Sequence, residues 1–179
     1  ELSHQWFGNL VTMKWWDDLW LNESFANMIE YVAVDKRHPE WRMWEDYTAH
    51  DCLSATNRDV HKDVQSVSVH VEDPNEIGPL FDPSIVYAKG GKLLKTLMDL
   101  LGEDAWRSGL ADYFKIHAYG NTTREDLWKC LNKYSDIDVP HLMNTWIVHA
   151  GQPLVGVAQP SQDSDATLSQ HRLLLDGSS

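Results

Sequence analysis

Hydrophobic residues recur at helical spacing along most of the chain. Between residues 21 and 35, Phe25, Met28, Ile29 and Val32 lie three and four positions apart, which is the spacing of one buried helix face. Similar patterns, bounded by proline and glycine, predict further helices at about residues 40–55, 84–101, 104–117, 122–134 and 140–150. The fold class predicted from this pattern is mainly α.

Three segments lack this spacing. Residues 10–20 are expected to be a connecting loop rich in aromatic residues, and residues 58–82 to be loops with one extended stretch of alternating valines. Residues 1–7 are too short to form a helix alone. They are expected to be the end of a helix that began upstream, with Gly8 and Asn9 as its stop signals.

Two local signals mark where later helices begin. Thr122 and Glu125 have the spacing of a capping box, which predicts a helix start at that point. Pro140 suits the first position of the last helix, and Gly151 marks its end.

The pattern changes after Pro153. Leu154, Val155 and Val157 are typical of a strand, a polar turn follows, and residues 166–175 predict a second strand. Two strands alone are marginally stable in water. We therefore expect a helical domain over residues 1–152 and the start of a β-sandwich domain, as a hairpin, over residues 153–179.

Composition excludes several classes of protein. Hydrophobic residues make up 42% of the 179 positions, which is enough for a core, and the formal net charge of −12 disfavours nucleic acid as a partner. No apolar run has the length of a membrane span. Cys52 and Cys130 lie far apart without metal-ligand spacing, so we expect reduced thiols in a cytoplasmic protein, with a disulfide as the open alternative.

The first four residues carry the candidate chemistry. Glu1 and His4 lie three positions apart, as in the last four letters of the zinc motif H-E-x-x-H, in which the glutamate is the general base. Glu23 follows His4 with eighteen residues between them, and a helix, a loop and a second helix bring such a residue back against His4. A surface helix pair is the alternative interpretation of the four letters alone.

The longer strings "HQWFGNLVT" and "WWDDLWLNESFA", with this separation, resemble the zinc aminopeptidases of the aminopeptidase N type, which are gluzincins. The string "FDPSIVYAKGGKLL" and the later helices extend the similarity over nearly the whole chain, and bacterial lysyl or alanyl aminopeptidases fit best. The resemblance implies a fold, in which residues 1–152 are the C-terminal helical half of a thermolysin-like catalytic domain. It also implies Zn²⁺ as the cofactor and peptides with a free N-terminus as substrates.

The resemblance further implies a role for each matching residue. His4 and Glu23 would be zinc ligands, Glu1 the general base, and Tyr87 a hydrogen-bond donor to the tetrahedral oxyanion. Without the resemblance, Tyr87 would be interpreted as a packed tyrosine. Asn22 either orients the carboxylate of Glu23 or caps a helix.

Trp15, Trp16 and Trp20 crowd the loop between the two helices that carry the candidate ligands. We expect these three indoles to hold the helices at their angle.

The first histidine of the motif would precede Glu1. We therefore expect the chain to be an excised piece of a larger enzyme, cut inside the metal site. Two ligands do not make a closed catalytic zinc site, so weak or no zinc binding and no peptidase activity are expected of the chain itself. A non-catalytic helical scaffold or interaction module of the same fold is the alternative. Self-association through cut surfaces is expected, and the acidic composition hints at lysine or arginine as the released residue.

Overall fold

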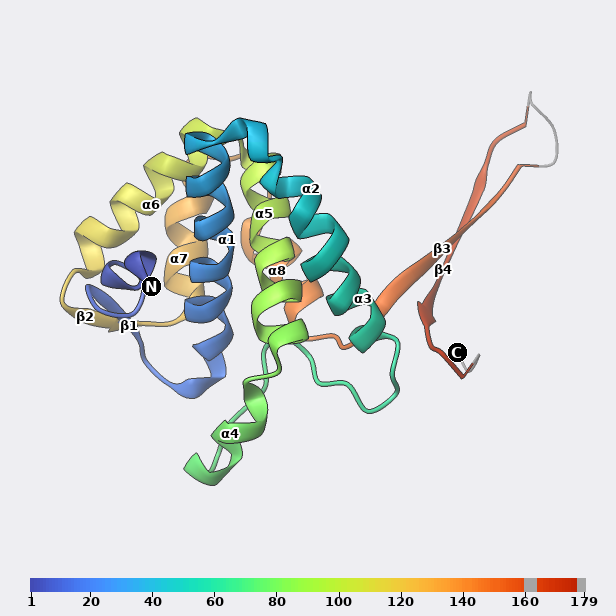
Figure 1. Ribbon diagram of the computed structural model, residues 1–179, viewed down its shortest axis with the longest axis horizontal. Coiled ribbons are helices and arrows are strands. Elements are labelled where there is room, and N and C mark those ends of the chain that lie inside the picture. Colours follow the sequence, from blue (N-terminus) through green and yellow to red (C-terminus); the bar gives the residue numbers. More distant parts are fainter. Residues whose placement is uncertain (160–163, 177–179) are drawn as a thin grey trace.

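The computed structural model describes residues 1–159 and 164–176, and it is mainly helical, as the sequence predicted (Figure 1). The helices are α1 (Leu19–Arg37), α2 (Met43–Tyr47), α3 (Leu53–Asp59), α4 (Ile77–Leu80), α5 (Gly90–Leu101), α6 (Glu103–His117), α7 (Arg124–Asn132) and α8 (Val139–Ile147). The strands are β1 (Val11–Met13), β2 (Gly120–Thr122), β3 (Gln152–Ala158) and β4 (Thr167–Leu173). Two π-helical segments, Thr48–Cys52 and Pro83–Lys89, join α2 to α3 and lead into α5.

The helices pack side by side around one core. Helix α1 lies against α5, α2 and α3 flank them, and α6 and α7 cover the opposite side (Figure 1). Fully buried side chains at this junction include Leu21, Met28, Leu94, Leu97 and Trp128. Because α1 and α5 are central, the residues they carry have fixed positions relative to each other.

No helix among the described residues is both long and apolar enough to cross a bilayer.

The helix predicted from residue 40 starts later in the structure. Pro39–Trp41 form a 3₁₀ turn, and Arg42 follows with a positive φ of 54° before α2 begins. Proline fixes its own φ and starts a turn easily, while the left-handed residue behind it breaks the helical path. The predicted helix over residues 40–55 is therefore the composite of α2, the π segment and α3, which ends at Asp59.

The capping box of α7 lies one residue later than the sequence predicted. Thr123 is the N-cap, and its pair is Asp126 rather than Glu125. Thr122 is unavailable as a cap because it belongs to β2 and its hydroxyl lies 2.7 Å from the hydroxyl of Tyr113. Glu125 is turned away and forms an ion pair with Arg124.

A short parallel ladder joins β1 to β2, which the sequence did not predict. Val11, Thr12 and Met13 pair with residues 120–122, and the N–H of Lys14 extends the ladder to the carbonyl of Thr122 at 2.7 Å. Strands of three residues are too short to show an alternating pattern. The ladder fixes the chain between the 3₁₀ turn at the N-terminus and α1.

The alternating valines do not form a strand. Val67 and Val71 are buried at 2% exposure each, yet the segment belongs to no ladder among the described strands. Its alternation reflects side chains that reach the core from an irregular loop, which is held at Ser68 by a hydrogen bond from its N–H to the carbonyl of Ile147.

The predicted hairpin is present. Strands β3 and β4 pair antiparallel from Gln152 opposite Leu173 to Ala158 opposite Thr167, and they extend away from the helices (Figure 1). Part of the predicted polar turn, residues 160–163, lies outside the described residues. The base of the hairpin is tied to α3 by the hydrogen bond from Gln152 Nε2 to Thr56 Oγ1. The division of the chain into domains at residues 152 and 153 stays a prediction.

Candidate metal centre

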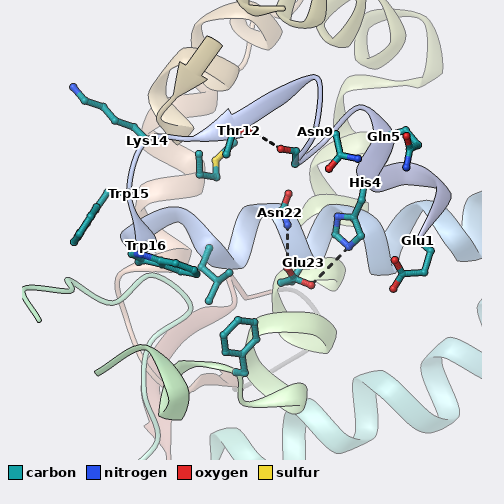
Figure 2. Close-up of a pocket in the computed structure, with 14 residues that line it drawn as sticks. Glu1, His4, Gln5, Asn9, Thr12, Lys14, Trp15, Trp16, Asn22 and Glu23 are labelled. Carbon is teal, nitrogen blue, oxygen red and sulfur yellow. Dashed lines mark hydrogen bonds and ion pairs between the residues drawn. The ribbon is translucent and has the colours of Figure 1, made fainter. Parts of the chain in front are cut away.

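His4 and Glu23 meet at the mouth of a cleft. Nε2 of His4 lies 3.8 Å from Oε2 of Glu23, with the two side chains 22% and 15% exposed (Figure 2). Two donor atoms bound to one tetrahedral zinc at its usual bond lengths lie about 3.4 Å apart. The pair therefore needs only a small adjustment to share one ion.

The turn that carries His4 is anchored by Phe7. Leu2–Gln5 form a 3₁₀ turn rather than the end of an α-helix. Phe7 is fully buried, and its ring stacks on Phe25 of α1 at 4.1 Å. The carbonyl of Phe7 accepts a hydrogen bond from Nδ1 of His4 at 3.1 Å. A proton held on Nδ1 leaves the lone pair on Nε2, which faces Glu23, and metal-binding histidines are commonly oriented in this way.

Gly8 lets the chain pass close over Asn22. Its φ is +120°, and a Cβ at this position would lie 2.8 Å from Oδ1 of Asn22. Asn22 in turn donates a hydrogen bond from Nδ2 to Oε1 of Glu23 at 2.9 Å. Helix α1 has Asp18 as its N-cap, so Asn22 does not cap the helix but contacts the carboxylate.

Tyr87 and Glu1 lie near the same carboxylate. Burial raises the pKa of Tyr87 to about 12, with further contributions from the charge of Glu23, from hydrogen bonding to Glu23 and from the charge of Glu1. Tyr87 is half-buried in the π-helical segment that precedes α5, while Glu1 is exposed and lines the cleft. The π-helical segment is tied to α1 by Ser24, whose hydroxyl donates to the carbonyl of Val86 at 2.5 Å.

The cleft has a volume of about 860 Å³ and runs from Glu1, His4 and Glu23 to Trp15 and Trp16 (Figure 2). Within residues 1–159 and 164–176, no group of three or more histidine, cysteine, aspartate or glutamate side chains could hold a metal ion. His4 and Glu23 are two side chains of the types that bind zinc, and a catalytic zinc needs three protein ligands.

The three tryptophans before α1 have different environments. Trp20 is 1% exposed, and its ring lies 6.4 Å from that of Trp128 in α7. Its expected role in holding the two ligand-bearing helices at their angle stays a prediction. Trp15 and Trp16 are 46% and 39% exposed. The expectation that these two indoles hold the helices at their angle, rather than face the cleft, was wrong, because both indoles border the cleft.

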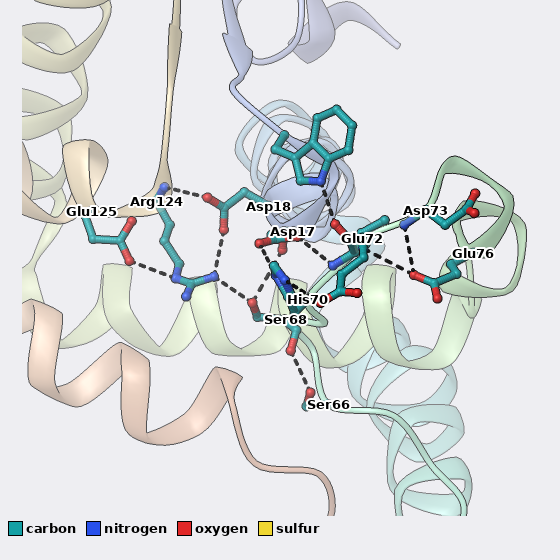
Figure 3. A network of polar contacts seen from close by, with 12 residues as sticks. Asp17, Asp18, Ser66, Ser68, His70, Glu72, Asp73, Glu76, Arg124 and Glu125 are labelled. Atoms are coloured by element: carbon teal, nitrogen blue, oxygen red, sulfur yellow. Dashed lines mark hydrogen bonds and ion pairs between the residues drawn. The ribbon is translucent and has the colours of Figure 1, made fainter.

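A polar network that sequence reasoning missed fixes the start of α1. Asp18 accepts hydrogen bonds from the backbone N–H of Arg124 at 3.0 Å and from its guanidinium at 2.9 Å, and the guanidinium also donates to Ser68 (Figure 3). Burial raises the pKa of Asp18 although Arg124 opposes the shift. Asp17 accepts a hydrogen bond from the N–H of Val71 at 2.8 Å. The paired aspartates before a helix signal a cap, but partners more than fifty residues away leave no local pattern.

Comparison with known proteins identifies the family of the chain. The model of the family described as "Peptidase family M1 domain" matches residues 1–146. The chain is 46% identical to aminopeptidase N of Lactobacillus helveticus over 98% of its length and 53% identical to aminopeptidase N of Lactococcus lactis subsp. cremoris over 87%. It is also 40% identical to tricorn protease-interacting factor F2 of Thermoplasma volcanium over its full length. The matched regions are 21%, 18% and 22% of these proteins, so the chain spans about a fifth of the length of its curated relatives. The chain belongs to peptidase family M1.

Proposed function

We propose that this chain supplies two of the three metal ligands of a zinc metallo-aminopeptidase, which removes the N-terminal residue from peptides. The observation that carries the proposal is the 3.8 Å approach of His4 Nε2 to Glu23 Oε2, with Nδ1 of His4 engaged by the carbonyl of Phe7. The aminopeptidase N relatives support the reaction class.

Each residue near the pair has a chemical task. Zinc, when bound, would polarise the scissile carbonyl and lower the pKa of water. Glu1 takes the proton from the attacking water and passes it to the leaving amine. Tyr87 carries its phenol proton, since its pKa is raised to about 12 from an ordinary value that already lies above neutral pH, and it donates a hydrogen bond to the oxyanion. Asn22 keeps the carboxylate of Glu23 turned toward His4 through its hydrogen bond of 2.9 Å.

The chain by itself is inactive in this proposal. Two ligands give weak zinc binding at neutral pH, because a catalytic zinc site needs three protein ligands and one open position. The third ligand would be a histidine directly before Glu1, as the H-E-x-x-H motif requires.

Calorimetry with zinc tests the ligand set. The chain is compared with the same chain extended by one histidine before Glu1. We expect weak binding without the extension and tight one-to-one binding with it. In the extended chain, His4→Ala and Glu23→Gln should each weaken binding at least tenfold. His149→Ala is the matched control, because His149 is exposed, lies outside the cleft, and has its ring Nδ1 hydrogen-bonded to the carbonyl of Thr145.

Two results would contradict the proposal. Tight stoichiometric binding by the unextended chain would show that two ligands suffice or that other residues bind. Equal and weak binding by both chains would favour the non-catalytic scaffold instead.

A further inference from the structure

Three exposed aromatic side chains border the cleft that contains the candidate metal centre. Trp15, Trp16 and Phe81 are 46%, 39% and 40% exposed, and all three line the same cavity as His4 and Glu23. We call these three residues the aromatic rim. Phe81 comes from the end of α4, more than sixty positions from the two tryptophans, so the fold rather than the local sequence brings the three together.

The backbone under the rim is held in place. The indole N–H of Trp15 donates to the carbonyl of Val71 at 2.8 Å, and the N–H of Val71 donates to Asp17 at 2.8 Å. Asp18 continues this anchor to Arg124 (Figure 3). The polar atom of Trp15 is thereby satisfied inside the protein, while almost half of its surface remains in water. A fixed aromatic surface loses little conformational freedom when a ligand covers it, which favours binding.

The two ends of the cleft carry opposite charges. Glu1 and Glu23 lie at the end with His4, and Lys14 lies beyond Trp16 at the other end (Figure 2). A short peptide has a positive amine at one end and a carboxylate at the other. Its amine therefore suits the end with Glu1 and Glu23, and its carboxylate suits the end with Lys14.

We propose that the aromatic rim is a subsite for an aromatic side chain of a short peptide, at a position after the first residue. The peptide lies with its amine toward Glu1 and Glu23, so that the following side chain reaches Trp16 and Phe81. The inference rests on the proposed function, because the peptide crosses His4 and Glu23. It adds a substrate class, namely short peptides with an aromatic residue behind the residue that is released.

Peptide titrations of the ¹⁵N-labelled chain without zinc test the proposal. The indole N–H signals of Trp15 and Trp16 are followed by NMR with Ala-Phe-Ala, Phe-Ala-Ala and Ala-Ala-Ala as probes. We expect Ala-Phe-Ala to shift these signals and to bind about tenfold more tightly than Ala-Ala-Ala, as an added aromatic contact would allow. Phe-Ala-Ala should bind more weakly than Ala-Phe-Ala.

Variants locate the contact. Trp16→Ala and Phe81→Ala should each remove most of the preference for Ala-Phe-Ala over Ala-Ala-Ala. Trp41→Ala should leave it unchanged, because Trp41 is also exposed (59%) but stacks on His38 outside the cleft. Circular dichroism confirms that each variant is folded. If Trp16→Ala unfolds the chain, the peptide preference of Phe81→Ala is used on its own to test the subsite.

Equal affinity for Ala-Phe-Ala and Ala-Ala-Ala would overturn the subsite, and tighter binding of Phe-Ala-Ala would overturn the orientation. These outcomes are separate from those of the zinc experiment. If zinc binding fails while the preference for Ala-Phe-Ala persists, only the metal proposal is lost. If zinc binds as expected and the preference is missing, only the aromatic subsite is lost.

Discussion

Lys89 and Asp59 form an ion pair that is almost completely sealed from water. Nζ of Lys89 lies 2.7 Å from Oδ2 of Asp59, and the side chains are 5% and 0% exposed. Lys89 also donates to the carbonyl of Gly151 at 3.1 Å, and Asp59 accepts from the N–H of Gly151 at 2.9 Å. The pair thus joins α3, the segment that carries Tyr87, and the start of the hairpin.

Removing one member of this pair should lower the free energy of unfolding. Lys89→Met leaves the carboxylate of Asp59 buried without its partner, and such changes lower the free energy of unfolding by about 3–5 kcal/mol. The double variant Lys89→Met with Asp59→Asn removes both charges and keeps an acceptor for Gly151, so it should be clearly more stable than the single variant. Urea unfolding followed by circular dichroism measures both. A double variant as unstable as Lys89→Met would contradict this account.

Gly90 should not tolerate a methyl group. A Cβ on Gly90 would lie 1.9 Å from Oγ of Ser24 and 2.9 Å from its Cβ, and both residues are buried. Gly90→Ala should lower the free energy of unfolding by about 1–3 kcal/mol, as overpacked cores do, and Ser24→Gly should restore part of the loss. Gly78→Ala is the matched control, since nothing lies within 4 Å of that position. Thermal unfolding of the variants tests this, and equal effects at the two glycines would disprove it.

Substitutions at Gly8 and Gly102 distinguish the effect of backbone strain from damage to the proposed metal centre. Both have positive φ, +120° and +80°, but a Cβ on Gly8 would meet Asn22 while one on Gly102 would meet open space. Alanine at either position should destabilise the fold, because left-handed backbone suits glycine. In the histidine-extended chain, only Gly8→Ala should weaken zinc binding, by tenfold or more. Equal zinc affinities for the two variants, measured by calorimetry, would show that Asn22 does not orient Glu23.

The pKa of His70 should be higher than that of an ordinary histidine. Its hydrogen bond to Asp17, at 3.0 Å, and the charge of Asp17 raise the pKa of the imidazole above 6.5. Because the folded pKa exceeds the unfolded value, this contact stabilises fully below about pH 6.5, and its contribution is lost as the pH rises through the folded pKa.

NMR titration of the His70 ring measures the shift. Asp17→Asn should bring the pKa back toward 6.5. Asp73→Asn, a change in the same loop whose carboxylate contacts Asn75 instead, should leave it unchanged. An unaltered His70 pKa in Asp17→Asn would refute the assigned partner.

The sequence predicted the helical parts of this fold well because one periodic face is a local property. Phe25 and Met28 of α1 lie on the face that is buried, as their spacing indicated. Contacts between distant segments left no comparable signal. The strands β1 and β2 have only three residues each, and the partner of Asp18 is Arg124, more than a hundred positions away. Neither contact can be predicted from residues that are adjacent in the sequence.

The candidate site was predictable only in part for the same reason. The spacing of Glu1, His4 and Glu23 suggested the chemistry, but the tautomer of His4 depends on the carbonyl of Phe7, which any residue type would provide. Trp15 and Trp16 were misjudged because a run of aromatic residues does not reveal which rings are buried. The position of the Trp15 indole depends on its hydrogen bond to Val71, which Asp17 holds in turn.

The pairing of β1 with β2 means that the candidate metal centre depends on residues far away in the sequence. The loop between His4 and α1 runs alongside residues 120–122, which belong to the turn between α6 and α7. A synthetic peptide of the first twenty-five residues would keep Glu1, His4 and Glu23 and lose the support that shapes their arrangement. To transfer this site to another scaffold, the residues of that distant turn would have to be transferred as well.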